Sequence, residues 1–359
     1  MIRLRSFIVI AIAVFIAVVG TVPAHIVFAA ESTGSSASLS IAPKKTYVID
    51  PGQSVKDKLT IRNLDSNSSL ELTLRVVDFT FTNNGGTPKL FLAEDAPQTT
   101  WSLKPFLKVP DSVTIPPNGS KTLDMSVSVP AGHGAGSYYS AIIYSSGAPG
   151  SGGNVGLSAS GVTLVFTQIP GQVNEDLKLE KFGLYNNSAQ GDVDGYTMFT
   201  GNDPKKVAYT LKNGGNVTES PVGSITLKDL FGHETKINDV NPNGSLALIG
   251  QTRTFTSCIK LKSQNINFSG TATEATECDS PGLWPGYYSM SLDLYYGQNG
   301  NMTREVTGKS GFWYLPLWFI IVSIAVLSVL AWYIRKLVLA IQRKRHGGVK
   351  LGRTPPRRR

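Results

Sequence analysis

The chain has 359 residues and a formal net charge of +9, from 34 Lys and Arg against 25 Asp and Glu. Two of the cations precede residue 30 and ten follow residue 334, so the segment between them has 22 cations against 25 acids. This slightly acidic balance gives no electrostatic support for nucleic-acid binding, and about 280 residues are enough for two domains with their own cores.

The N-terminus has the pattern of a secretory signal peptide. Arg3 and Arg5 precede a long apolar run, and Val27-Phe28-Ala29 offers small residues for cleavage. We therefore predict a signal peptide over residues 1–30, followed by a polar leader over residues 31–36. An uncleaved signal anchor is the alternative, and it would leave the same central segment outside.

The central segment has a strand pattern throughout. From Leu123 to Val129 every second residue is apolar, which places one set of side chains inward and the other toward water. Turn signals such as Pro51-Gly52 and Asn84-Gly85-Gly86 separate short runs of this kind. Short strands with frequent turns predict β-sandwiches.

The segment also repeats itself loosely. Pro-Asn-Gly-Ser begins at Pro117 and again at Pro242, and an apolar strand runs into Asn63 and again into Asn213. The common order of these matches predicts two related sandwiches separated by loops of unequal length. The predicted bounds are residues 37–171 for the first sandwich and residues 173–305 for the second.

Two cysteines, Cys258 and Cys278, lie in the second of these segments. An even pair in an exported segment predicts one disulfide that closes a polar surface insertion. No His or further Cys lies nearby in sequence to complete a metal site with them. Two free thiols are the alternative if the compartment does not oxidise exported cysteines.

An uncharged, mostly apolar run over residues 312–334 is long enough to cross a ~30 Å hydrocarbon core as a helix. Trp313 and Trp332 near its ends are typical of the membrane interface, whereas a buried core helix is usually shorter and carries a polar stripe. Residues 306–311 before the run are predicted as a short stalk. The tail over residues 335–359 has ten cations and no acid, which predicts a cytoplasmic tail that contacts anionic lipid. We therefore expect a single-pass protein of the cell membrane with its N-terminal part extracellular.

The sequence offers no clear catalytic pattern. Neither His133 nor His233 has a partner at metal-ligand spacing. The glycine-rich stretch from Gly132 to Gly136 lacks the Lys and the strand-to-helix context of a phosphate-binding loop. We predict no enzyme, no cofactor and no metal. Paired acids acting on a sugar stay open as the enzymatic alternative, because proximity in space is not visible in sequence.

Aromatic residues are better candidates for binding a partner. Tyrosines occur in adjacent pairs, so in a strand one member points inward and the other outward. An outward ring can stack on a sugar or anchor a protein, and the alternative is that each ring packs on neighbouring strands. The candidates are Trp101, Trp284, Tyr138, Tyr139, Tyr287 and Tyr288.

Four elements carry a family resemblance. The first sandwich has Ile49-Asp50-Pro51-Gly52-Gln53 and Ile169-Pro170-Gly171, and the second has Asn213-Gly214-Gly215-Asn216-Val217 and Leu230-Phe231-Gly232. In these the chain resembles the bacterial WxL-interacting proteins, although its cysteine-bounded insertion departs from that pattern. The resemblance implies an all-β fold: two immunoglobulin-like β-sandwich domains in tandem, plus one C-terminal transmembrane α-helix.

What the resemblance implies is binding rather than chemistry. The family's first domain is linked to peptidoglycan, and its second to a host-protein or WxL-protein surface. We expect a membrane-anchored bacterial surface protein that binds cell-wall polymer or another surface protein, in adhesion or scaffolding. The alternative is a chaperone-like module for assembly or display of other surface proteins, which lends a client an edge strand near residues 59–63 or 162–169.

Overall fold

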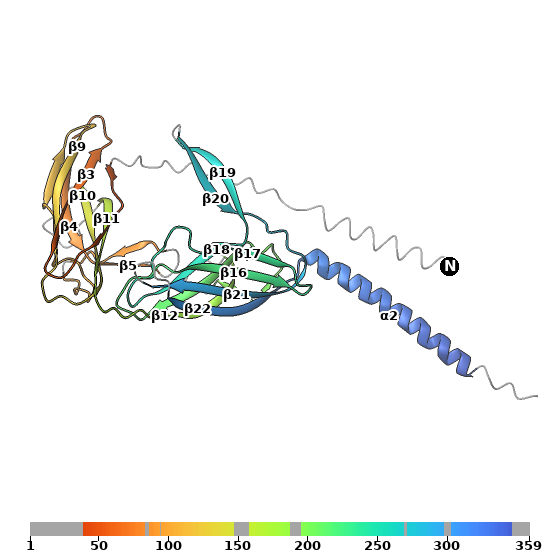
Figure 1. Cartoon of the computed structure of the whole chain (residues 1–359). Helices are drawn as coiled ribbons and strands as arrows, with labels where there is room; N and C mark the ends of the chain where they lie inside the picture. Colours follow the sequence, from red (N-terminus) through yellow and green to blue (C-terminus); the bar gives the residue numbers. More distant parts are fainter. Residues whose placement is uncertain are drawn as a thin grey trace, which may run out of the picture. The chain divides into compact units, whose positions relative to one another are not determined.

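The computed structural model describes residues 39–82, 86–93, 95–146, 158–186, 195–268, 271–297 and 303–346. The predicted signal peptide and leader and the last part of the predicted tail lie outside these residues. The described chain consists of β-strands up to Tyr314 and then forms one long helix (Figure 1). The expected all-β fold, with two immunoglobulin-like sandwiches and one C-terminal apolar helix, is confirmed.

The first sandwich consists of a four-stranded and a five-stranded sheet. The first of these has the order β1 (Leu39–Ile41), β3 (Ser54–Asn63), β9 (Ser120–Ser128), β7 (Leu107–Lys108). The second has the order β2 (Lys44–Val48), β11 (Ser158–Ile169), β10 (Gly136–Ser146), β4 (Leu70–Val77), β8 (Ser112–Ile115). A separate hairpin is formed by β5 (Phe79–Phe81) and β6 (Pro88–Leu90).

The second sandwich repeats this arrangement. Its four-stranded sheet has the order β13 (Tyr196–Thr197), β12 (Leu177–Tyr185), β15 (Lys206–Asn213), β18 (Thr252–Cys258). Its five-stranded sheet has the order β14 (Phe199–Thr200), β22 (Arg304–Tyr314), β21 (Gly286–Tyr296), β16 (Val222–Asp229), β17 (Glu234–Ile237). In both domains an outer strand, β2 or β14, runs parallel to the domain's last strand, β11 or β22. This shared topology explains the loose repeat in the sequence.

A buried asparagine ends the matching strands β3 and β15. Asn63 and Asn213 are both fully buried, and the side-chain amide of each donates to backbone carbonyls of adjoining loops. Asn213 Nδ2 lies 2.7 Å from Val217 O and 2.9 Å from Ala247 O, and Asn63 Nδ2 lies 2.8 Å from Ser68 O. Because carbonyls in buried loops need a donor, the same residue recurs at the same place in both domains.

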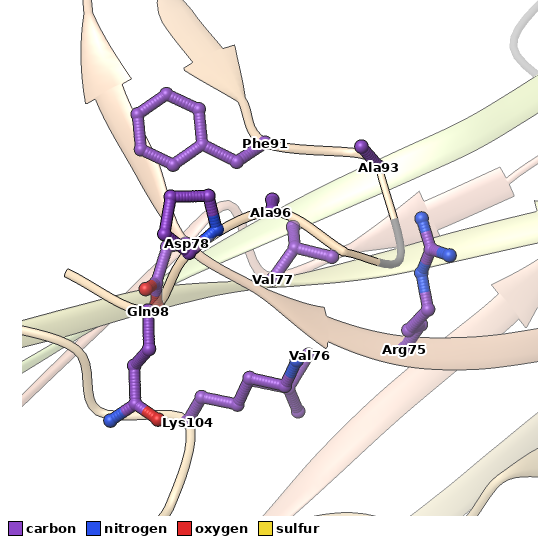
Figure 2. A pocket seen from close by; sticks show the side chains of 10 residues that line it. Arg75, Val76, Val77, Asp78, Phe91, Ala93, Ala96, Gln98 and Lys104 are labelled. Carbon is purple, nitrogen blue, oxygen red and sulfur yellow. The ribbon is translucent and has the colours of Figure 1, made fainter.

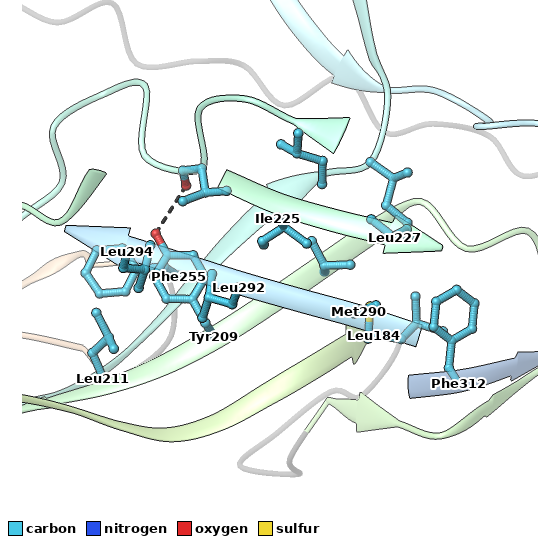
Figure 3. Close-up of a cluster of buried hydrophobic side chains, with 14 of the residues drawn as sticks. Leu184, Tyr209, Leu211, Ile225, Leu227, Phe255, Met290, Leu292, Leu294 and Phe312 are labelled. Atoms are coloured by element: carbon cyan, nitrogen blue, oxygen red, sulfur yellow. Dashed lines mark hydrogen bonds between the residues drawn. The ribbon is translucent and has the colours of Figure 1, made fainter. Parts of the chain in front are cut away.

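Each sandwich encloses its own hydrophobic core. In the second, Tyr209 stacks on Phe255 with ring centroids 5.2 Å apart, and the Tyr209 hydroxyl donates to Val240 O (Figure 3). In the first, Met125 and Val127 of β9 are buried, as the alternation in sequence predicted. The alternating residues of strands facing each other across a sandwich thus fill its interior.

Strand β10 in the five-stranded sheet of the first sandwich is buried on both faces. Ile142 and Tyr144 of β10 belong to the core of that sandwich. Ala141 and Ile143, on the opposite face of the same strand, join a third cluster that includes Leu248 of the second sandwich. A strand covered on both faces has a continuous apolar run instead of an alternating one.

The helix begins later than the sequence analysis predicted. Residues 306–311, predicted as a stalk, lie in β22, which pairs with β21 along its whole length. Phe312, predicted as the first residue of the span, is fully buried and stacks on Tyr288 with centroids 5.3 Å apart. The strand end and the helix are both apolar, so their sequences merge into one run.

Helix α2 spans Leu317–His346. It is the one helix in the described chain that is long and apolar enough to cross a membrane, from Leu317 to Arg343, and none of that stretch is buried. A core helix would be covered by other elements, so this alternative does not fit. The helix also continues past Ile334 into the predicted basic tail.

The predicted disulfide is confirmed. Cys258, the last residue of β18, is bonded to Cys278. Between them β19 (Leu261–Phe268) and β20 (Thr271–Cys278) pair with each other as a separate two-stranded hairpin. The bond therefore joins the end of β18 to the end of β20 at the base of an insertion, as predicted from the sequence.

Candidate functional site

A loop of the second sandwich packs on part of the outer face of the first sandwich's five-stranded sheet. Leu248, between β17 and β18, is fully buried in a cluster with Tyr139 and Phe81. Trp101 stacks on Tyr139 with ring centroids 6.1 Å apart, and Gln251 Nε2 donates to Phe81 O. Apolar burial and a hydrogen bond thus hold the two sandwiches together at this place.

A turn over residues 213–217 makes a second contact between the sandwiches. Asn216 O accepts the Ser137 N–H at 3.0 Å, and Asn216 Nδ2 donates to Ala135 O at 3.1 Å. Gly136 has φ +149°, and a Cβ placed there would lie 2.8 Å from Asn216 O. The Asn-Gly-Gly-Asn-Val element that carries part of the family resemblance therefore docks one sandwich onto the other.

A cavity of about 230 Å³ lies beside this contact, with walls from both sandwiches. Most of the lining side chains are hydroxyl, amide or charged groups. They are Lys44, Thr46, Ser137, Phe166, Thr167 and Gln168 from the first sandwich, and Thr218, Glu219, Ser220 and Leu246, with Gly297, from the second. Lys44 Nζ lies 5.2 Å from the Phe166 ring centroid, within the range of a cation–π contact.

Two polar atoms in the lining are buried without a partner. Glu219 is 2 % exposed, and its backbone is fixed by a pair of hydrogen bonds with Ala247, at 3.1 and 2.7 Å. Its Oε1 atom has no hydrogen-bond partner among the described residues, and the same holds for Oγ1 of Thr167, which is 1 % exposed. Buried polar groups in proteins are normally hydrogen-bonded, so each such atom is a place where a ligand or water can bind.

The carboxyl group of Glu219 has an unusual pKa. Burial, together with the charge of Glu175, raises its pKa to about 7, against the opposing effects of a Gly297 N–H hydrogen bond and Arg304. Arg304 Nε is itself paired with Glu175 at 3.2 Å. Near neutral pH the Glu219 carboxyl can therefore either donate or accept a hydrogen bond from a bound group.

A second cavity of about 230 Å³ lies in the first sandwich, next to β4 and the loop that follows β6 (Figure 2). Arg75 and Lys104 provide its cationic groups, but Arg75 Nη2 already donates to Leu92 O at 2.7 Å. Asp78 at its wall accepts hydrogen bonds from the hydroxyls of Ser102 and Ser140 at 2.6 and 3.0 Å. These groups hold the surrounding loops in place, so the cavity between the sandwiches is the better candidate site.

The tyrosine pairs alternate as predicted. Tyr139 and Tyr288 are buried, whereas Tyr138 and Tyr287 are half-buried on the opposite faces of β10 and β21. Tyr138 packs edge-on against His133 with centroids 4.6 Å apart, and its hydroxyl donates to a backbone carbonyl. Tyr138 thus packs on the core of the first sandwich, whereas Tyr139 lies on the outer face of the sheet in the cluster with Leu248. Partner binding by the candidate tyrosines stays a prediction.

The two candidate tryptophans lie in different surroundings. Trp101 is half-buried in the contact between the sandwiches, whereas Trp284 is 78 % exposed in the loop before β21. The structure does not bring the six candidate aromatics together in one patch, since Tyr139 and Trp101 meet at one end of the second sandwich and Trp284 lies near Tyr288 at the other. Glu219 and Thr167, which face the cavity, were not among the residues singled out from the sequence.

No family model matches the chain, and no match is found among curated proteins. Several solved structures are similar to it. The class 5 fimbriae chaperone CfaA is 11 % identical, with 78 % of this chain and 100 % of that chain covered and a TM-score of 0.31. The E. coli chaperone DraB is 13 % identical, with 77 % and 97 % covered and a TM-score of 0.30. A chaperone–tip adhesin complex of CFA/I fimbriae is 10 % identical, with 76 % and 98 % covered and a TM-score of 0.34. Such distant similarity assigns no function to this chain.

Proposed function

We propose that the chain is a membrane-anchored bacterial surface protein that binds without catalysis, through the cavity between its two sandwiches. The ligand is a polar part of a cell-wall polymer or of another surface protein. The observation that carries this proposal is the pair of buried, unpartnered polar atoms of Glu219 and Thr167 in a cavity walled by both domains. Each atom is of the kind that a ligand hydroxyl or amide can satisfy.

The size of the cavity supports a small docking group. At about 230 Å³ it is below the ~300–1,000 Å³ of pockets for drug-sized molecules, so it fits one sugar ring or one side chain of a larger partner. The apolar helix α2 holds the sandwiches at a membrane, and an exported orientation with a cytoplasmic tail follows from the positive-inside rule. Display at the surface would bring the cavity to wall polymers and to other exposed proteins.

The test is binding by the full-length protein in lipid nanodiscs. We expect solubilised peptidoglycan fragments to bind the native protein, and Glu219→Gln to weaken binding by about tenfold, because the amide cannot ionise and has one acceptor oxygen where the carboxylate has two. Glu71→Gln is the matched control, since Glu71 is exposed on β4 of the first sandwich. Equal binding by the native protein and Glu219→Gln would place the ligand elsewhere, and the absence of binding would favour a protein partner over a wall polymer.

The second candidate function is the chaperone-like one. The strands named for it from the sequence are not outer strands, because β3 lies between β1 and β9 and β11 lies between β10 and β2. The outer strand β18 is the better candidate, since its seven residues pair only with β15 among the described strands. A client could add a strand at that free edge. Unchanged display of all other surface proteins in cells that lack this protein would contradict this function.

A further inference from the structure

Exposed apolar residues gather at the end of the second sandwich where α2 begins. They belong to the region of β13 and β14, the turn after β16, the loop before β21 and the end of β22. The residues are Met198, Phe199, Leu230, Phe231, Trp284 and Trp313, with exposed fractions from 40 % for Trp313 to 86 % for Phe231. We call this set the apolar tip. Large apolar side chains grouped in this way mark a surface that is covered by a partner.

Strand register places the members of the apolar tip at one end. Phe199 of β14 is paired with Trp313 of β22, and Trp313 is also paired with Tyr287 at the start of β21. Asp229, which ends β16, is paired with Tyr288. The turn after β16 and the loop before β21 therefore both emerge beside the last residues of β22.

The same end is tied closely to the helix. Only Leu315 and Pro316 separate β22 from α2, and Leu315 N donates to Thr200 O at 2.9 Å. Pro316 O accepts the Phe319 N–H at 2.9 Å, so the connection is fixed on both sides. Two residues reach at most ~7 Å. The apolar tip therefore cannot leave the surface of a membrane that α2 crosses.

We propose that the apolar tip docks into the headgroup layer of the membrane that α2 crosses, and this rests on the membrane anchoring in the proposed function. Aromatic rings prefer this layer, where their apolar bodies leave water without entering the hydrocarbon core. The sequence placed such a belt at residues 312–314 of the helix, but Phe312 is inside the sandwich. The interfacial aromatic residues therefore come from the apolar tip of the sandwich and from Trp318 in the first turn of α2.

The test uses the full chain labelled with 5-fluorotryptophan in nanodiscs. The five tryptophans give five fluorine signals, which single Trp→Phe variants assign. Lipids with a nitroxide near the headgroup should broaden the Trp284 and Trp313 signals about threefold more than that of Trp101, which lies in the contact between the sandwiches. Trp284 is 78 % exposed, so water would reach it if the apolar tip were free. In nanodiscs a water-soluble gadolinium chelate should therefore broaden the Trp284 signal less than expected for a side chain exposed to that extent.

Two variants sharpen the test. Phe231→Ser should halve the broadening of Trp284 by the nitroxide lipid, because it removes a neighbouring anchor, whereas Val48→Ser, 65 % exposed on β2 of the first sandwich, should not change it. If the nitroxide lipid broadens the Trp318 signal but not the Trp284 signal, α2 crosses the membrane but the apolar tip does not dock on it, which would overturn the proposal. No broadening of Trp318 or Trp332 would instead overturn the anchoring. Shielding of Trp284 from both reagents would assign the tip to a protein partner and overturn lipid docking.

Discussion

At the scale of single residues, the buried carboxyl of Glu219 makes the stability of the fold depend on pH. Its folded-state pKa of about 7 lies above the ordinary value of 4.5, so the folded chain holds a proton that the unfolded chain releases. The free energy of unfolding therefore falls as pH rises from about 4.5 to about 7 and then levels off. The full difference is about 3 kcal/mol.

Glu219→Gln should remove this dependence, because the amide does not ionise. We expect the free energy of unfolding of the native protein to fall by about 3 kcal/mol relative to Glu219→Gln between pH 4.5 and pH 8. Urea unfolding at a series of pH values measures it, and subtracting the two curves cancels the other titrating groups. Parallel curves would show that Glu219 is not held protonated by the fold.

Some of these residue roles can be predicted from sequence and others cannot. The alternation of adjacent tyrosines predicted that the two members of each pair lie on opposite faces, and the recurrence of Asn63 and Asn213 marked matching strand ends. Glu219 follows Thr218 in a polar stretch without any period, so nothing local marks it as buried. Its neighbours Glu175, Ala247 and Arg304 are far away in the sequence, so its burial depends on long-range folding.

At the scale of elements, the disulfide hairpin forms a two-stranded sheet of its own, separate from the two sheets of the second sandwich. Joining residues 20 apart removes about 3 kcal/mol of chain entropy from the unfolded state. We expect the Cys258→Ser, Cys278→Ser double variant to lower the free energy of unfolding by up to that amount and to keep the strand content. Far-ultraviolet circular dichroism with urea unfolding measures both.

Deletion of residues 263–276 with a Gly-Ser bridge is the matched control for that variant. Because β19 and β20 pair only with each other among the described strands, we expect the shortened protein to be as stable as the native one. A large loss of stability in the deletion variant would mean that the hairpin packs on the sandwich and is part of its fold.

The loop before β18 couples the two sandwiches. Leu248 is fully buried against the first domain, so Leu248→Ala should cost about 2–4 kcal/mol and separate the unfolding of the two domains. Leu64→Ala is the control, since Leu64 is 46 % exposed. Scanning calorimetry should show one transition for the native protein and two for Leu248→Ala. A single, unshifted transition in the variant would exclude this loop as the coupling element.

The boundary between β22 and α2 shows where sequence reasoning fails for elements. Phe312, Trp313 and Tyr314 are as apolar as the helix that follows, so composition alone cannot separate strand from helix. The pairing of residues 304–314 with β21 decides it, and such pairing joins segments that are not adjacent in sequence. Strands with clear alternation, such as β9, could be predicted because the apolar and polar residues that alternate in them are neighbours in the sequence.

At the scale of the whole molecule, the continuous apolar run of β10 and the short connection to α2 have a common consequence. The run exists because the β5–β6 hairpin, Trp101 and a loop of the second domain cover the outer face of β10, and the Leu315-Pro316 connection ties that second domain to the helix. The sandwiches are thereby joined to each other and to the anchor without a long linker. The cavity between them lies at the end of the second sandwich away from α2, so the length of that sandwich separates the cavity from the helix.

The length and charge of α2 predict its orientation in the membrane. Leu317 to Ile334 is an uncharged stretch of about 27 Å as a helix, close to the ~30 Å hydrocarbon core. Lys336 Nζ lies 4.1 Å from the Trp332 ring centroid, so a cation and an indole together mark the far interface. Since ten cations follow residue 334, the positive-inside rule predicts that this interface is the cytoplasmic one.

Protease treatment of intact cells that carry a C-terminal epitope tag tests this orientation. We expect the sandwiches to be cut while a fragment with α2 and the tag survives, and we expect the tag to be lost only after the cells are permeabilised. Replacing the ten cations by Gln should give a mixed population, because the charge bias that selects one orientation is then gone. Loss of the tag from intact native cells would reverse the topology, and it would put the cavity between the sandwiches inside the cell, away from any wall polymer.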